Sequence, residues 1–173
     1  MRRTTKTGGF SIIPMALLAG AVTFFAQPTT CAAETLEADL KAVDAPTGRV
    51  SDRSVGYLRL TPGSKDKTVD ILVQILNLPQ VESEEAKKTD TSGHTEYLHA
   101  LRLLPSGDCS SIKVDATAKA LPEVGVRSDG SATETLTVTG FSLSDFLGKP
   151  IVMLTGADPK KPLVMACGVV KKD

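Results

Sequence analysis

The sequence is poor in aromatic and imidazole side chains, and this scarcity limits both its core and its chemistry. Its 173 residues include no Trp, two Tyr, five Phe and two His. A core built from this chain must therefore be aliphatic. Copper and zinc sites need several His, Cys or carboxylate ligands that converge on one point. With only His94 and His99, the chain offers few such ligands.

Other catalytic and binding motifs are missing as well. The sequence has no Gly-rich phosphate loop, no His pair at helical metal-binding spacing, and no Ser or Cys nucleophile with a plausible His base. Its Lys and Arg residues are scattered among carboxylates, whereas nucleic-acid-binding domains concentrate them on one face. The sequence therefore predicts neither a recognisable catalytic constellation nor a nucleic-acid partner.

The first 33 residues have the composition of a cleaved export signal. A basic head, MRRTTK, precedes an apolar run and the small-residue stretch CAAE. The apolar run is shorter than the about 20 residues of a spanning helix and contains Pro14, so cleavage after Ala33 is favoured over a stable membrane anchor. We therefore predict a signal peptide at 1–33, a mature domain at 34–173, and a periplasmic or extracellular location.

Cleavage at this point leaves a mildly acidic chain with two cysteines. It removes three basic residues and no acidic ones, which leaves 17 basic and 20 acidic residues. In an oxidising space an intramolecular disulfide between Cys109 and Cys167 is the default, with two buried free thiols as the alternative. A lipoprotein with Cys31 as the lipid acceptor is a weaker interpretation of the leader, because PTTC lacks the Leu expected before a lipidated Cys.

Apolar residues recur with period two along the mature chain, which is typical of half-buried strands. The clearest run is TVDILVQIL at 68–76, and similar short runs occupy residues 36–42, 55–60, 97–104, 112–118, 133–139, 150–154 and 163–170. The turn signals PGSKDK, SDGS and ADPKKP separate them, SLSDFLG indicates one helical turn, and PQVESEEAKKTDTSG indicates a polar loop. The pattern predicts an all-β fold, an antiparallel Greek-key sandwich or barrel of immunoglobulin-like type with about eight strands.

Three stretches follow one another as the motifs of a known family do. They are VGYLRLT at 55–61, HALRLLPSGDC at 99–109 and ACGVV at 166–170. Together they resemble the copper/zinc superoxide dismutase family, whose pattern H-G-F-H-x-H-x-x-G-x-C aligns with the second stretch without gaps. The resemblance covers nearly all of the mature chain. It implies a Greek-key β-barrel, bound copper and zinc, and a disulfide between Cys109 and Cys167.

At the positions where the family binds metal or guides superoxide, this chain carries other residues. The resemblance matches two copper-binding His to Arg102 and Leu104, a third to Leu154, the zinc-binding Asp to Ala120, and the guiding Arg to Val164. The long loop that holds the remaining zinc ligands and the bridging His is absent after the Cys. The sequence therefore predicts that the family's cofactors, copper and zinc, have lost their ligands.

The remaining histidines do not form a replacement site. His99 matches a packing residue of the family, and strand alternation points it away from Arg102 and into the core, where we expect a ring nitrogen to bond to the backbone. His94 shares the parity of Arg102, so the two imidazoles supply at most one ligand to any point. Met153 and Met165 carry soft sulfur for Cu(I), but apolar strands hold Met mainly for packing.

The sequence thus predicts an exported superoxide dismutase-like domain without catalytic residues or metal. Such a domain would serve as a non-catalytic binding or structural module of the cell envelope, as a homodimer or with another envelope protein. The alternative is an active superoxide dismutase with an unrecognised ligand set. If the alignment is right, Arg102, Leu104 and Leu154 lie on one side of the barrel and His99 points the other way.

Overall fold

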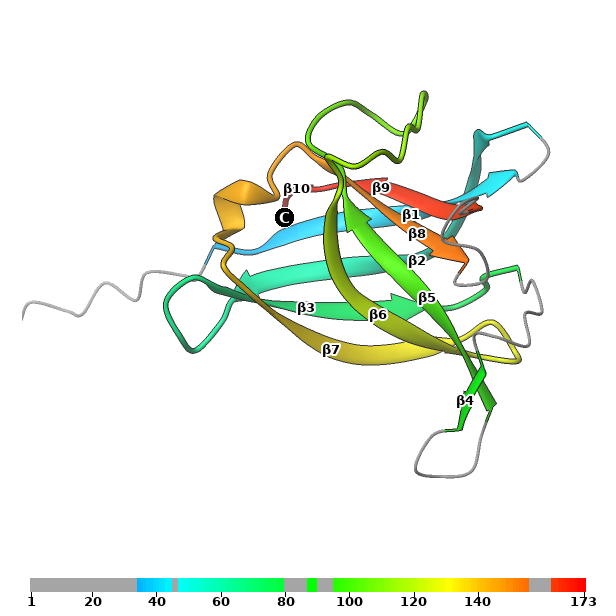
Figure 1. Ribbon diagram of the computed structural model, residues 1–173, viewed down its shortest axis with the longest axis horizontal. Helices are drawn as coiled ribbons and strands as arrows, with labels where there is room; N and C mark the ends of the chain where they lie inside the picture. Colours follow the sequence, from blue (N-terminus) through cyan, green and yellow to red (C-terminus); the bar gives the residue numbers. More distant parts are fainter. Residues whose placement is uncertain (1–33, 45–46, 80–86, 90–94, 156–162) are drawn as a thin grey trace, which may run out of the picture. The chain divides into compact units, whose positions relative to one another are not determined.

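The computed structural model describes residues 34–44, 47–79, 87–89, 95–155 and 163–173. These residues belong to one compact unit, whereas the predicted signal peptide, Cys31, His94 and the ADPKKP turn lie outside the described ranges. The described elements (Figure 1) are β1 (Leu36–Asp44), β2 (Arg49–Pro62), β3 (Thr68–Ile75), β4 (Lys87–Thr89), β5 (Thr95–Leu103), β6 (Lys119–Arg127), β7 (Ala132–Thr139), the 3-10 helix η2 (Leu143–Asp145), β8 (Pro150–Thr155), β9 (Val164–Val169) and β10 (Lys171–Lys172).

The strands form a nearly closed antiparallel barrel. Hydrogen-bonded neighbours follow the order β6-β5-β8-β9-β1-β2-β3-β7, and the short strands β4 and β10 add to β5 and β1. β3 pairs with β7 and β5 with β8, although long stretches of chain separate these partners. This exchange of neighbours is the Greek-key arrangement. The predicted all-β fold is confirmed.

The barrel interior follows from the period-two pattern. In β3 every second side chain is at most 1% exposed, namely Val69, Ile71, Val73 and Ile75, and the residues between them are half-buried. In β2, Leu58 and Leu60 are buried and Arg59 between them is exposed. Side chains of this kind from all the long strands form one cluster, which we call the interior cluster. Burial of each large aliphatic side chain contributes about 1.5–3 kcal/mol.

The strand predicted at 112–118 is wrong. This segment contains no strand, although Ile112 and Val114 are half-buried and Lys113 between them is exposed. The alternation arises because an extended segment packs one side onto the barrel without pairing with a strand. Asp115 then ends it, because its carboxylate accepts a hydrogen bond from the backbone N–H of Thr117 at 2.8 Å and forms a tight turn.

The strand that follows, β6, was not predicted as a separate strand. Pro122 interrupts its sequence pattern, and proline is tolerated only where a strand lacks a partner on one side. β6 meets this condition, since it pairs with β5 but not with β7, the next strand of the chain. Near the turn that joins β6 to β7, the N–H of Gly125 donates to the carboxylate of Glu134 on β7, at 3.0 Å.

The predicted helical turn is confirmed at η2. The N–H of Ser142 donates to Asp145 Oδ2 at 2.8 Å, and the two side chains also bond at 2.8 Å. These bonds lower the pKa of Asp145. Phe146, directly after this turn, is fully buried in the interior cluster.

Candidate functional site

A second apolar cluster lies on the outer face of the barrel. We call it the outer cluster. Its buried members are Val43, Leu104, Val152, Leu154 and Cys167, and the half-buried side chains packed against it are Val50, Ala100, Cys109, Ile112, Val114, Ala118 and Val164. No member belongs to the interior cluster.

β8 separates the two clusters. All six of its residues are buried, and successive side chains alternate between the clusters. Ile151 and Met153 belong to the interior cluster, whereas Val152 and Leu154 belong to the outer one. A strand that is apolar on both faces must be covered on both. The outer cover is the segment between β5 and β6, which is the green loop at the top of Figure 1.

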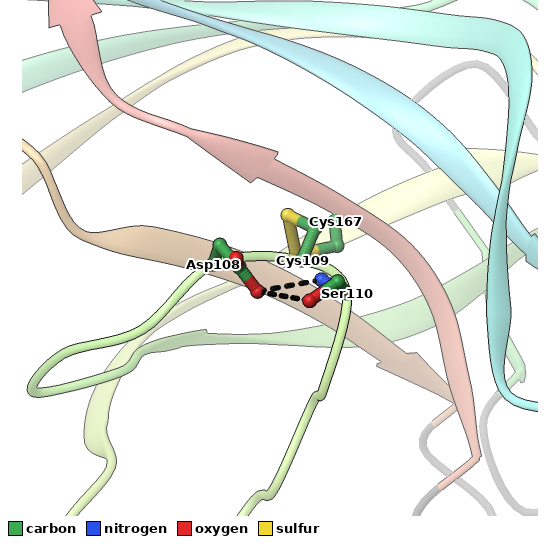
Figure 2. The surroundings of a disulfide bond; sticks show 4 residues. All are labelled: Asp108, Cys109, Ser110 and Cys167. Atoms are coloured by element: carbon green, nitrogen blue, oxygen red, sulfur yellow. Dashed lines mark hydrogen bonds between the residues drawn. A yellow bond between two sulfur atoms is a disulfide. The ribbon is translucent and has the colours of Figure 1, made fainter.

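A disulfide fixes this cover to the barrel. Cys109 of the covering segment and Cys167 of β9 are bonded with an S–S distance of 2.06 Å and a Cα–Cα distance of 5.8 Å (Figure 2). The predicted pairing is therefore confirmed, and the free-thiol alternative is wrong. Asp108 shapes the turn around Cys109, because its carboxylate accepts bonds from the backbone N–H of Ser110 at 2.9 Å and from its hydroxyl at 2.6 Å. These bonds lower the pKa of Asp108.

Three of the predicted site residues meet in the outer cluster. Leu104 and Leu154 are both buried there, and Val164 is half-buried against them. Leu154 is the cross-strand partner of Val164 on β9 and of Ala100 on β5. The N–H of Leu104 donates to the carbonyl of Pro150 at 2.9 Å, which holds the end of β5 against β8.

Arg102 and Ala120 lie at the margin of this cluster. Arg102 is the cross-strand partner of Val152 on one side and of Ala120 on the other. Its side chain is half-buried and Ala120 is exposed. The guanidinium donates to the carbonyl of Leu101 at 3.2 Å, and among the described residues it forms no salt bridge. A half-buried guanidinium of this kind can keep its charged end in water while its stem lies beside apolar side chains.

His99 lies on the other face of β5, as predicted. It is 2% exposed and points into the barrel, between Val124 of β6 and Thr155 of β8. In the part of the chain that the structure describes, neither Nδ1 nor Nε2 has a partner of suitable geometry, so the expected hydrogen bond to the backbone is not formed there. Burial lowers the pKa of His99, and the backbone carbonyl of Leu154 opposes this effect. His99 cannot ligate a metal in the outer cluster.

The residues at the predicted metal positions do not fit copper or zinc. Leu104 and Leu154 offer only carbon, Arg102 places a positive charge beside them, and both nearby sulfurs are bonded to each other. In the described part of the chain, no group of three or more His, Cys, Asp or Glu side chains is arranged to hold a metal. We therefore derive no metal chemistry at this cluster.

Much of the outer cluster was not predicted. Val43 and Val50 of the β1–β2 hairpin, and Ile112 and Val114 of the covering segment, contribute to it. One signal was available in the sequence, because PIVML at 150–154 is apolar at every position, unlike the alternating strands. Such a run indicates a strand with both faces covered.

Comparisons with known proteins define the fold class. No family model and no curated protein matches the chain. Among solved structures, the chain is similar to a Cu/Zn superoxide dismutase from Brucella abortus, with a TM-score of 0.52 and 13% identity over 79% of this chain and 99% of that one. The likeness shows the Greek-key β-barrel fold of that enzyme. Where the chain is described, no helix is long and apolar enough to cross a membrane.

Proposed function

We propose that this protein is an exported, superoxide dismutase-like barrel that has lost its copper and zinc ligands and acts as a non-catalytic binding or structural module of the cell envelope. The observation that supports it is the packing of Leu104, Leu154 and Val164 in one apolar cluster. These are the positions at which the family resemblance places two copper ligands and the superoxide-guiding arginine.

Replacement of metal-binding histidines by aliphatic residues has a physical reason. An imidazole without its metal, buried beneath the covering segment, would lower the free energy of unfolding by about 1–3 kcal/mol for each unpaired polar group. Leucine and valine remove this cost and add apolar burial. Arg102 supports the same proposal, because a fixed positive charge at the margin repels a metal cation.

Two features support export. The leader has a basic head and an apolar run, and the Cys109–Cys167 bond is of a kind that persists mainly in oxidising compartments. Without a catalytic site, the domain would act through its surface, as a homodimer or with an envelope protein.

An assay of superoxide dismutation separates this proposal from the alternative, an active superoxide dismutase with an unrecognised ligand set. The protein is purified with its disulfide intact, incubated with copper and zinc, and washed free of loosely bound metal. We expect no dismutation above that of a metal-free sample. Metal-dependent turnover that survives the wash would contradict the proposal and support the alternative.

A triple variant, R102H/L104H/L154H, provides a sharper control. It restores the imidazoles at the three copper positions implied by the resemblance. We still expect no efficient dismutase, because the zinc loop, the bridging His and the guiding Arg remain missing. Turnover near the diffusion limit would show that three side chains alone separate this barrel from an enzyme, and that the cover is no barrier.

A further inference from the structure

The barrel interior contains an imidazole that the proposed function does not use. Among the described residues, the buried polar or charged side chains are His99, which is 2% exposed, and Thr155, which is 8% exposed. The two are cross-strand partners on β5 and β8. Within the described ranges, neither ring nitrogen of His99 has a hydrogen-bond partner. An imidazole in this position is held neutral, because an unpaired charge in an apolar interior is costly.

The described elements around His99 provide no buried charge of opposite sign. Tyr97 shares its face of β5, and Val124 lies opposite it on β6. On β7, Glu134 occupies an interior-facing position, but its carboxylate accepts the N–H of Gly125 at the β6–β7 seam. Among the described residues a protonated His99 therefore has no buried counter-charge, and proton uptake favours an arrangement in which the ring reaches water.

We propose that His99 is an acid-sensitive switch: proton uptake by its ring separates β5 from β8 and loosens the outer cluster that covers them. Leu154 couples the two sites. Leu154 precedes Thr155, which is the cross-strand partner of His99 on β8, and the Leu154 side chain is buried in the outer cluster. Ala100, the neighbour of His99, faces that cluster opposite Leu154. This inference does not depend on the proposed function.

The direction of the effect follows from the pKa. Burial lowers the pKa of His99 below its ordinary value of 6.5, and the Leu154 carbonyl opposes this only in part. The unfolded chain, with its histidine near that ordinary value, therefore binds more protons below about pH 6.5. The contribution of neutral His99 to the free energy of unfolding is fully present above this pH. It is lost as the pH falls toward the pKa of His99 in the folded protein. One histidine changes the unfolding constant by at most about tenfold per pH unit.

The pH window isolates histidine from the carboxylates. The pKa values of four exposed Asp side chains are lowered from 3.8 by hydrogen bonds from neighbouring Ser or Thr residues, and these are Asp108, Asp115, Asp129 and Asp145. Stability that depends on them is present above about pH 4 and is lost only at lower pH. Between pH 7 and 5.5, these four carboxylates therefore do not contribute to the change, and variants of each histidine assign it.

The test is urea unfolding followed by circular dichroism, since the chain has no Trp, with the disulfide intact at several pH values from 7 to 5.5. We expect the unfolding constant of the wild type to rise several-fold over this range. His99→Leu and His99→Gln should remove the dependence, the first without a polar group and the second with one. His94→Gln, the matched control at the other histidine, should retain it.

Hydrogen exchange locates the opening in the wild type and needs no variant. After correction for the intrinsic rates, amides of β5 and β8 should exchange faster at pH 5.5 than at pH 7, and those of β2 and β3 should not. A pH-independent wild type, a dependence retained in both His99 variants, or one removed by His94→Gln would overturn the proposal. So would uniform exchange across the barrel.

Discussion

The interior cluster and the outer cluster are both aliphatic and share β8, yet the fold depends on them to different degrees. The interior cluster is built from one face of every long strand, and burial of this face forms the core of the fold. The outer cluster is built from β8 and its neighbours, a hairpin and a covering segment with no strand of its own. The fold therefore constrains these side chains less, and polar or metal-binding residues could replace them. In this protein they are apolar.

The two regions also differ in how they are held together. Hydrogen-bonded strands enclose the interior cluster, whereas the segment over the outer cluster depends on the Cys109–Cys167 bond and its own packing. The comparison indicates that a covalent bond replaces strand pairing where the cover is irregular.

The largest effect is expected from removal of the disulfide. The bond closes a loop over a sequence separation of 58 residues, so the double variant C109A/C167A should lose about 4 kcal/mol of unfolding free energy in the chain-entropy model. Chemical denaturation measures this. In this variant, amide hydrogen exchange should increase more in the covering segment than in the strands of the barrel. A loss below about 1 kcal/mol would mean that packing alone holds the cover.

A somewhat smaller effect is expected from a cavity in the outer cluster. Leu154→Ala should cost about 3 kcal/mol, within the range for buried leucine, because Leu154 is 3% exposed. The matched control is Leu101→Ala on the interior face of β5, where the side chain is fully buried. Similar losses would identify the outer cluster as a second core. A loss under 1 kcal/mol at Leu154 alone would show that the cover collapses onto the barrel without cost.

The strands show how far the sequence alone could lead. Period two identified β2 and β3 because one face of each strand is buried and the other is exposed or half-buried. The same period gave a wrong strand at 112–118, because an extended segment that packs one side on the barrel shows the same alternation. β6 was missed because of Pro122, since proline is compatible with a strand only at an unpaired edge. Which strand forms an edge depends on tertiary pairing, and the local sequence does not show this.

The candidate site divides in the same way. The disulfide could be predicted from two cysteines and a predicted export signal. The opposite orientation of His99 and Arg102 could be predicted from strand alternation. The lack of a hydrogen bond to the His99 ring could not be predicted. It depends on the position of β8, which lies far from His99 in the sequence. The cover over Leu154 was also missed, because its residues come from separate loops.

A small effect is expected at Arg102, which marks the boundary between the outer cluster and water. Arg102→Met removes one hydrogen bond to the Leu101 carbonyl and keeps an apolar stem of similar length. The change in unfolding free energy should be below about 1 kcal/mol in either direction. A loss above 2 kcal/mol would reveal a buried partner for the guanidinium and would make this margin part of the core.

On the proposed function, the outer cluster binds no catalytic metal. The most direct measurement is elemental analysis of the disulfide-bonded protein after incubation with copper and zinc and removal of loosely bound metal, with L104A as a matched variant. We predict less than about one tenth of an equivalent of either metal in both samples, since Leu104 and Leu154 offer no ligand. One equivalent of copper or zinc per chain in the wild type would contradict the account.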